Sequence, residues 1–339
     1  MPNLGWFRKV DSNLFSTSTM VPTKIPIIKY GRDLLCVLSG QITTTGASVI
    51  SEDNPLVLVK AIDLVGASGE SGKSGSLHRI SATELYMLNA FQQGRFPWIQ
   101  RTGPTTTTAY WFYSAVVLPF DTFPAESLTL LPHPAFTNLE LDVTWGAIAD
   151  LGTNVGTTFT TQPRLDIYEL TREFAPPSPP SLMKTIGKQQ NLVASGPNDI
   201  DLKTGQPIQE ILLRVNDNSV RSDTFVTQID LIENDGIYHL SGIPWNVMQA
   251  YNCYRASDNG AGPICFPFVE FGDVITGTTI GLGVTNRATV KGYTYINLMD
   301  LEGAPIPTGG MDTFKLRLTT TTSAGGTPNA VVVLRQRVT

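Results

Sequence analysis

The chain has 339 residues, of which 41% are hydrophobic and only 16% are charged, and its formal net charge is −5 at pH 7. Nucleic-acid binding through counterion release needs clustered Lys and Arg, so this charge balance argues against direct binding to nucleic acid. The 30 Gly, the 23 Pro and the runs of Thr at 105–108 and 319–322 favour strands joined by turns over helical bundles.

The cysteines and the apolar runs restrict the cellular context. Cys36, Cys253 and Cys265 are too few for a disulfide framework, so we expect reduced core residues. No apolar run approaches the roughly 20 residues of a membrane-spanning helix, and the N-terminus lacks the plan of a signal peptide. We therefore expect synthesis and folding in a cytoplasm.

Residues 1–20 lack a sustained hydrophobic period and are predicted to form an N-terminal arm. The arm carries two aromatic side chains next to two cations, Trp6, Phe7, Arg8 and Lys9. This mixture suits a lipid headgroup layer or phosphates. A disordered or partner-docked arm is the alternative interpretation.

The first half then alternates between strand patterns and turn residues, with one helix. Ser81 and Glu84 form a capping box, which predicts a helix that reaches Gln92 and stops before Gly94 and Pro97. The predicted strands are 27–30, 34–38, 56–65, 109–119, 139–144 and 164–170.

A proline-rich run at 176–180 must be extended and stiff, and it marks a domain boundary. The second half repeats the order of events, with a helix at 245–254. Its predicted strands are 208–215, 225–232, 265–271, 280–284, 290–296, 314–319 and 330–338.

The two halves resemble copies of one unit. Residues 58–65 match 225–232 in their strand-like alternation, and residues 80–91 match 240–251. In the second pair a Ser precedes apolar residues three apart, which are Leu85, Leu88 and Phe91 in one copy and Trp245, Met248 and Tyr251 in the other.

Strands at this spacing predict an all-β chain of two tandem eight-stranded jelly-roll domains, each a β-sandwich with a short helix inserted between early strands. The predicted divisions are an arm at 1–20, a first jelly roll at 21–175, a proline-rich linker at 176–190 and a second jelly roll at 191–339.

Residues 67–74 fit a permissive phosphate-loop pattern in which Lys73 would contact phosphates. Three features argue against nucleotide binding. The helix begins too late, the second copy replaces the segment with the short turn 233–236, and no parallel βαβ pattern surrounds it. We expect a solvated hairpin loop.

Other chemical sites have little support. His78, His133 and His239 show no metal-ligand or hydrolase spacing, so no metal and no cofactor are expected. Asp63 and Asp230 occupy equivalent strand positions, which suggests paired carboxylates of the glycosidase kind. A repeated Asp that bonds a neighbouring turn is the simpler interpretation, and we expect no enzyme.

The duplicated Ile-Asp-Leu strand with its Ser-capped helix, the 176–180 linker and the closing strands resemble the double jelly-roll major capsid proteins of tailless icosahedral viruses. The tectivirus, corticovirus and finnlakevirus groups of bacteriophages, many of them with an internal membrane, are the nearest in character. The resemblance covers roughly residues 21–339 and is architectural.

The resemblance implies a structural virion protein whose homotrimers are pseudo-hexagonal tiles of an icosahedral shell. The implied partners are the chain itself, neighbouring capsomers, penton or minor capsid proteins and an internal lipid membrane reached by the N-terminal arm. The candidate core or interface anchors are Trp98, Trp111, Trp145 and Trp245.

Two other functions remain open at this stage. A carbohydrate-binding or glycoside-active double β-sandwich would use exposed aromatics such as those at 110–113. A trimeric phage spike or receptor-binding protein would also be rich in strands.

Overall fold

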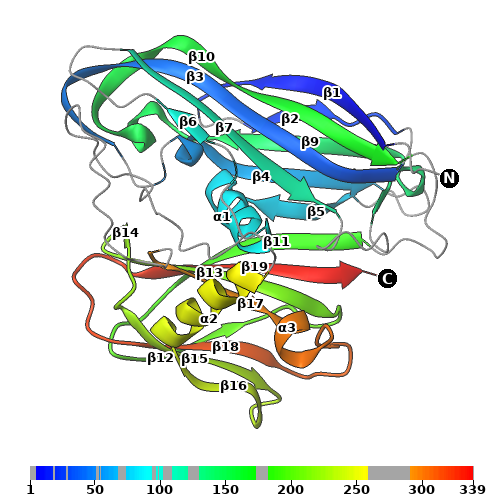
Figure 1. Ribbon diagram of the computed structural model, residues 1–339, viewed down its shortest axis with the longest axis vertical. Helices are drawn as coiled ribbons and strands as arrows, with labels where there is room; N and C mark the ends of the chain where they lie inside the picture. Colours follow the sequence, from blue (N-terminus) through cyan, green and yellow to red (C-terminus); the bar gives the residue numbers. More distant parts are fainter. Residues whose placement is uncertain are drawn as a thin grey trace.

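Two stacked bodies make up the molecule, one for each half of the chain (Figure 1). The upper body contains strands and a helix from residues 5–172, and the lower body contains those from residues 182–338. The all-β fold predicted from the sequence is confirmed. The computed structural model describes residues 5–17, 20–27, 30–50, 53, 55–67, 74–93, 97, 99–101, 109–120, 130–172, 182–258 and 291–338.

The upper body, here called the first roll, has eight principal strands among its described residues. In chain order they are β1 (Gly5–Leu14), β2 (Met20–Lys24), β3 (Tyr30–Ile50), β4 (Val59–Ala67), β5 (Ser74–Ile80), β7 (Ala109–Pro119), β9 (Asn138–Trp145) and β10 (Gly152–Arg172). Helix α1 (Ala82–Gln93) follows β5. The short elements are η1 (Leu56–Leu58), β6 (Ile99–Arg101), β8 (Leu131–Pro132), η2 (His133–Ala135) and η3 (Ile148–Leu151).

The lower body, the second roll, has the same plan among its described residues. Its principal strands are β11 (Leu182–Asn191), β12 (Gly196–Asp201), β13 (Ile208–Asp217), β15 (Val226–Glu233), β16 (Ile237–Pro244), β17 (Tyr293–Asn297), β18 (Phe314–Thr320) and β19 (Asn329–Val338). Helix α2 (Trp245–Asp258) follows β16, and the short elements are β14 (Val220–Arg221) and α3 (Leu298–Glu302).

Sheet order shows that both bodies are jelly rolls. In the first roll the strands are ordered β1-β10-β3-β7 in one sheet and β2-β9-β4-β5 in the other. In the second roll the orders are β11-β19-β13-β17 and β12-β18-β15-β16. Counted along each half, strands 1, 8, 3 and 6 share one sheet and strands 2, 7, 4 and 5 share the other, which is the jelly-roll arrangement. Each sheet is named below by its two central strands.

Three details differ from the sequence prediction. Part of the expected arm at 1–20 is strand β1, which pairs with β10 along its length. The second part of the expected linker at 176–190 is strand β11, which pairs with β19. Each helix lies between the fifth and sixth principal strands of its roll, later than expected. Pairing with a distant strand supplies the hydrogen bonds that order these segments, and local periodicity does not reveal it.

Alternating burial explains why the strands form these sheets. Along β18 and β9 every second residue is buried, so one face of each strand packs in a core and the other faces outward. The largest buried side chains include Trp145 in the first roll and Trp245 in the second. Cys36 is also buried, and burial raises the pKa of its thiol to about 12. Cys265 and the side chain of Cys253 lie outside the described residues.

Strand registers correct the alignment of the two copies. Ile62 pairs with Ile80 in the first roll, and its counterpart Ile229 pairs with Ile243 in the second. The sequence alignment had matched Ile80 with Leu240, three residues too early. Because the apolar residues of both helices recur every three positions, a slip of three leaves the pattern intact. Ser81 does accept a hydrogen bond from the Glu84 amide, but α2 begins at Trp245, after Pro244.

An asparagine on each helix binds the edge of the sixth strand. The Asn89 amide donates to the Val117 carbonyl and accepts from the Val117 N–H, both at 2.7 Å. Asn252 makes the same two bonds with Tyr295 and also accepts from the Thr294 hydroxyl. These side chains satisfy backbone groups that would otherwise be open to another strand.

We call these two side chains, Asn89 and Asn252, the asparagine clamps. Replacing either of them with alanine should leave a buried backbone N–H and C=O of the sixth strand unpaired. We expect Asn89→Ala and Asn252→Ala each to lower the free energy of unfolding by about 1–3 kcal/mol, as measured by urea denaturation. Asn246→Ala, an exposed position on the same helix α2, should change it by less than about 0.5 kcal/mol. Equal changes in the free energy of unfolding at all three positions would contradict this role of Asn89 and Asn252.

Candidate functional site: the junction between the two rolls

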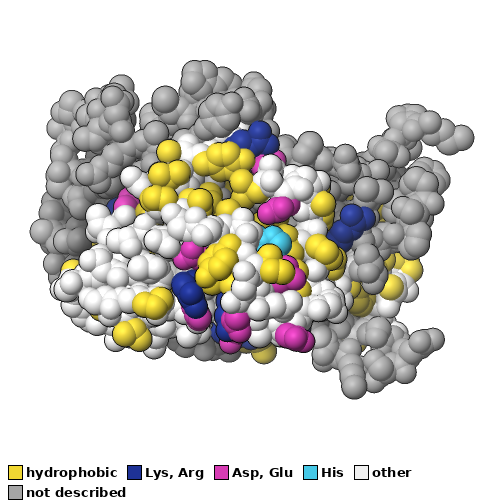
Figure 2. Space-filling model, turned by 90° about the horizontal axis from the view of Figure 1, so that it is seen from below, with side chains coloured by type: hydrophobic (Ala, Val, Ile, Leu, Met, Phe, Trp, Pro, Cys, Tyr) yellow, Lys and Arg dark blue, Asp and Glu magenta, His cyan; other side chains and the backbone are white. Residues whose placement is uncertain are grey.

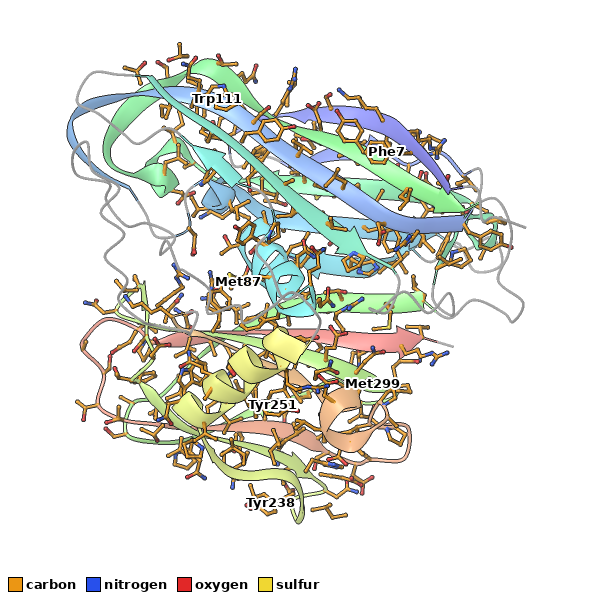
Figure 3. All side chains as sticks on the ribbon, viewed as in Figure 1. Phe7, Met87, Trp111, Tyr238, Tyr251 and Met299 are labelled. Carbon is orange, nitrogen blue, oxygen red and sulfur yellow. The ribbon has the colours of Figure 1, made fainter. Side chains whose placement is uncertain are left out.

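Helix α1 lies where the two rolls meet, and nearly all of its side chains are buried (Figure 3). It packs on β4 and β7 of its own roll and contacts β13 and α2 of the second roll. Below it, β5 pairs in parallel with β11 through His78 and Arg79. The β9–β4 sheet of the first roll thus continues into the β19–β13 sheet of the second.

Apolar packing joins one face of the second roll to the core of the first roll. Leu212, Tyr293, Tyr295, Val331 and Val333 of the second roll belong to the same buried cluster as the core of the first roll. The ring of Phe91 on α1 stacks on that of Tyr295, with centroids 5.4 Å apart. The outward face of the β19–β13 sheet is therefore shielded from water. Separation of the two rolls would expose this apolar surface.

The first polar contact of the junction joins α1 to β13. Arg214 Nη2 lies 2.9 Å from Glu84 Oε1, and Arg214 Nη1 lies 3.4 Å from Asp53 Oδ2. Burial raises the pKa of the Glu84 carboxyl, and the positive charge of Arg214 opposes that rise. The ion pair compensates two charges that would be costly to bury alone.

The second polar contact joins α1, β13, β19 and the end of β7. Arg335 Nη1 binds both Glu210 oxygens at 3.1 and 3.0 Å, and Gln92 donates to Glu210 Oε2 at 2.7 Å. Arg335 also donates to the Pro119 carbonyl of the first roll. The directional bonds fix how one roll is placed on the other.

A pocket of about 480 Å³ opens beside this junction. Its positively charged lining residues are Lys60, Arg79 and Arg214, and its negatively charged ones are Asp53 and Glu84. Among the described residues no aromatic side chain lines it, and Arg214 binds both of its carboxylates, those of Asp53 and Glu84. Among the residues that the structure describes, no group of three or more His, Cys, Asp and Glu is placed to hold a metal ion.

The motifs that suggested chemistry have structural roles. β4 and β5, which flank residues 68–73 of the phosphate-loop look-alike, pair antiparallel as a hairpin, while those six residues lie outside the description. Asp63 accepts a hydrogen bond from Ser76, and Asp230 accepts one from the Gly242 amide. The two carboxylates lie in different sheets, each bonded to the strand that follows it.

The tryptophans have three different placements. Trp145 lies in the core of the first roll and donates to Asn13, and Trp245 lies in the core of the second and donates to Asp223. Trp111 is partly exposed on β7 and stacks on Tyr113. Trp98 lies outside the described residues, as does the Trp6 side chain.

The cations near the N-terminus already have partners in β10. Arg8 donates two hydrogen bonds to Glu169, and Lys9 Nζ lies 2.9 Å from Asp166. Glu169 also lies 2.8 Å from the buried His133 Nε2. Phe7 is exposed and stacks on Tyr168. Sequence reasoning missed Glu169, because only strand pairing brings it to Arg8 and His133.

The comparisons with known proteins give one consistent result. The STIV MCP, the capsid protein of Sulfolobus turreted icosahedral virus, matches with a TM-score of 0.71 and 15% identity over 99% of this chain and 97% of that chain. The PBCV-1 virus capsid matches with a TM-score of 0.62 and 10% identity over 99% and 94%. The major capsid protein of bacteriophage PM2 matches with a TM-score of 0.55 and 13% identity over 99% and 97%.

The chain has the double jelly-roll fold of viral capsid proteins. Both rolls and their connection are included in these matches, since they extend over nearly the whole of each chain. No protein-family model and no curated protein matches the sequence. No described helix of the double jelly roll has the length and apolar character to cross a membrane.

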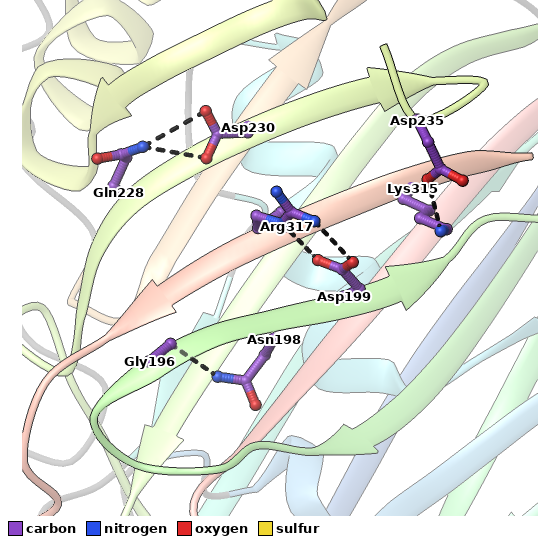
Figure 4. A network of polar contacts seen from close by, with 8 residues as sticks. All are labelled: Gly196, Asn198, Asp199, Gln228, Asp230, Asp235, Lys315 and Arg317. Carbon is purple, nitrogen blue, oxygen red and sulfur yellow. Dashed lines mark hydrogen bonds and ion pairs between the residues drawn. The ribbon is translucent and has the colours of Figure 1, made fainter.

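Removing one partner of the buried ion pair should destabilise the double jelly roll strongly. We expect Arg214→Met to lower the free energy of unfolding by about 3–5 kcal/mol, because Glu84 is left buried and unpaired. The matched control is Arg317→Met on β18, whose bonds to Asp199 on β12 are drawn in Figure 4; the two side chains are 34% and 36% exposed. That pair should contribute about 0–1 kcal/mol. Equal losses in denaturant titrations would contradict the assignment of the junction.

His78 should make the junction sensitive to acid. Burial, together with the charges of Arg335 and Lys184, lowers the pKa of His78 from 6.5 to about 3. Between these values the unfolded chain binds a proton that the folded chain does not, so stability is present at neutral pH and falls as the pH drops through this window.

Below pH 6 we expect the free energy of unfolding of the wild-type chain to fall by up to about 1.4 kcal/mol per pH unit more than that of the His78→Phe variant. Thermal unfolding of both proteins from pH 7 to pH 4 measures this difference. Parallel pH curves would show that the imidazole is not held neutral.

Proposed function

We propose that the chain is a major capsid protein that builds the shell of an icosahedral virus. The observation that carries this proposal is the extent of the structural match. Both jelly rolls, in order, correspond to capsid proteins over 99% of this chain, and those proteins contain little beyond the matched part. A fold shared through one domain alone would support it far less.

The architecture suits a tile. Two similar rolls joined through an apolar junction present repeated side walls, so three chains would supply six walls around one axis. Such a homotrimer is nearly hexagonal and would pack edge to edge with neighbouring capsomers. The loops at the two ends of the rolls would then face the outside and the inside of the shell.

The described surface gives little support to the carbohydrate-binding alternative. The exposed Trp111 and the half-buried Tyr113 lie on strand β7, and among the described residues no aromatic side chain lines the pocket beside the junction. Asp63 and Asp230 are in different sheets. We therefore propose a structural role without enzymatic activity, in the virion.

Further partners follow from the shell. A trimeric tile cannot occupy a five-fold position of an icosahedral lattice, so we include penton or minor capsid proteins among the partners. Contact of Trp6–Lys9 with an internal membrane stays a prediction. Exposed Phe7 favours it, whereas the ion pairs of Arg8 and Lys9 leave less free positive charge for lipid headgroups.

Purified protein should elute as a species of three chains, each of 36.8 kDa, and should form closed shells under assembly conditions. Gel filtration with light scattering and negative-stain microscopy measure both properties. Monomers with affinity for glycans would instead favour the carbohydrate-binding function, and elongated trimers without shells would favour a spike.

A further inference from the structure

The pocket beside the junction has walls from both rolls. The first roll contributes residues of η1, β4, the end of β5 and the first turn of α1, and the second roll contributes residues of β11, β13 and β19. Its volume of about 480 Å³ lies within the range of pockets that hold small organic molecules. A molecule bound in this pocket would contact both rolls at once.

The space arises where β5 and β11 diverge. The two strands pair in parallel through Thr185 and Ile186 of β11. β5 then ends at Ile80 and the chain continues into α1, whereas β11 extends to Asn191. Gly187, the first residue of β11 after the paired segment, lines the pocket. The pocket therefore lies beside the part of β11 that extends beyond β5.

The backbone does not explain why residue 187 is glycine. Its φ is outside the left-handed region, and a Cβ there would lie 3.4 Å from the nearest neighbouring atom, the Arg79 carbonyl oxygen, which is an ordinary contact. Glycine weakens the interior of a strand, and it often marks a site where a ligand or another backbone approaches closely. Since the neighbouring backbone leaves room for a side chain at Gly187, this position favours a ligand.

The buried part of the lining is largely apolar. Val59 and Ile80 of the first roll and Val331 and Val333 of the second roll line the pocket, and each of them is at most 8% exposed. An apolar chain that lies against these four side chains would leave water, which is favourable in proportion to the apolar area covered. The lining therefore suits a ligand with a hydrocarbon part.

The charges of the lining leave a positive surplus. Three cations and two carboxylates line the pocket, and both carboxylates already bind Arg214. The other two cations, Lys60 and Arg79, are 45% and 65% exposed. The carboxylates nearest to them, Asp150 at 3.0 Å and Asp63 at 3.9 Å, are outside the lining. The exposed end of the pocket therefore favours an anionic group.

The first turn of α1 adds hydrogen-bond donors. Ser81 and Thr83 both line the pocket. Ser81 Oγ accepts a hydrogen bond from the Glu84 N–H at 3.2 Å, so its own O–H can donate to a bound anion. The N-terminal end of the helix dipole acts in the same direction, because it favours negative charge.

Exposed apolar side chains on the lower face of the second roll lack this combination. Figure 2 shows them interspersed with charged ones. On β16, the strand at the bottom of Figure 1, Ile237 and Tyr238 are 55% and 49% exposed. A hydrocarbon chain adsorbed on such side chains would stay in contact with water, so this face supplies the control for non-specific binding.

We propose that the pocket binds a small amphiphilic anion, a carboxylate with an apolar chain of about eight carbons. The carboxylate lies near Lys60 and Arg79, and the chain lies along the valines of the two rolls. Because the walls belong to both rolls, the ligand binds only the docked arrangement and stabilises the junction by linkage. This role is separate from the building of a shell.

Octanoate is the probe, because it has this charge and this chain length. We expect isothermal titration of the full chain to give one site per chain with a Kd of about 0.1 mM or tighter. Octanol has the chain without the charge, and acetate has the charge without the chain, so each should bind about tenfold more weakly or worse. Octanoate should also raise the Tm of the protein.

Two variants locate the site. Gly187→Leu places a side chain in the pocket and should abolish octanoate binding. Arg79→Gln changes an exposed residue, so it should keep the fold, weaken octanoate binding about tenfold and leave octanol binding unchanged. Tyr238→Ala is the control on β16 and should change neither. If Gly187→Leu does not fold, Arg79→Gln decides between a site in the pocket and binding elsewhere.

The outcomes are distinct from those of the capsid assay. Absence of octanoate binding, or binding that is unchanged in Arg79→Gln, would overturn the site. Equal binding of acetate would overturn the amphiphilic ligand class, and equal loss in Tyr238→Ala would indicate adsorption on the surface. Each of these results leaves shell formation untouched as a test of the capsid function.

Discussion

The structure depends on one constraint, which is that the outward face of the β19–β13 sheet is apolar and has to be kept from water. Leu212, Tyr295 and Val333 meet this constraint by belonging to the core cluster of the first roll. The continuous sheet through β5 and β11 and the nearly complete burial of α1 accompany that contact.

Polar groups at the junction select one placement among many that would bury similar area. Arg335 and Gln92 converge on Glu210, and Arg214 binds Glu84. A shifted docking would leave some of these charges buried without partners, at a cost of several kcal/mol. Asn89 and Asn252 add a second restriction, because they bond to backbone groups on β7 and β17 that would otherwise be open to another strand.

Local periodicity and capping in the sequence predict many of the strands, helices α1 and α2 and the division into similar halves. The 109–119 strand and the end of the first helix near Gln92 agree with the structure within a residue or two. The remaining features depend on pairing between distant parts of the chain. Strand β1 is ordered by β10, and Glu169 meets Arg8 and His133 only because strand pairing brings them together. The three-residue shift between the helices is visible only in the registers of the strands that precede them, because a slip of three residues leaves the hydrophobic pattern of a helix unchanged.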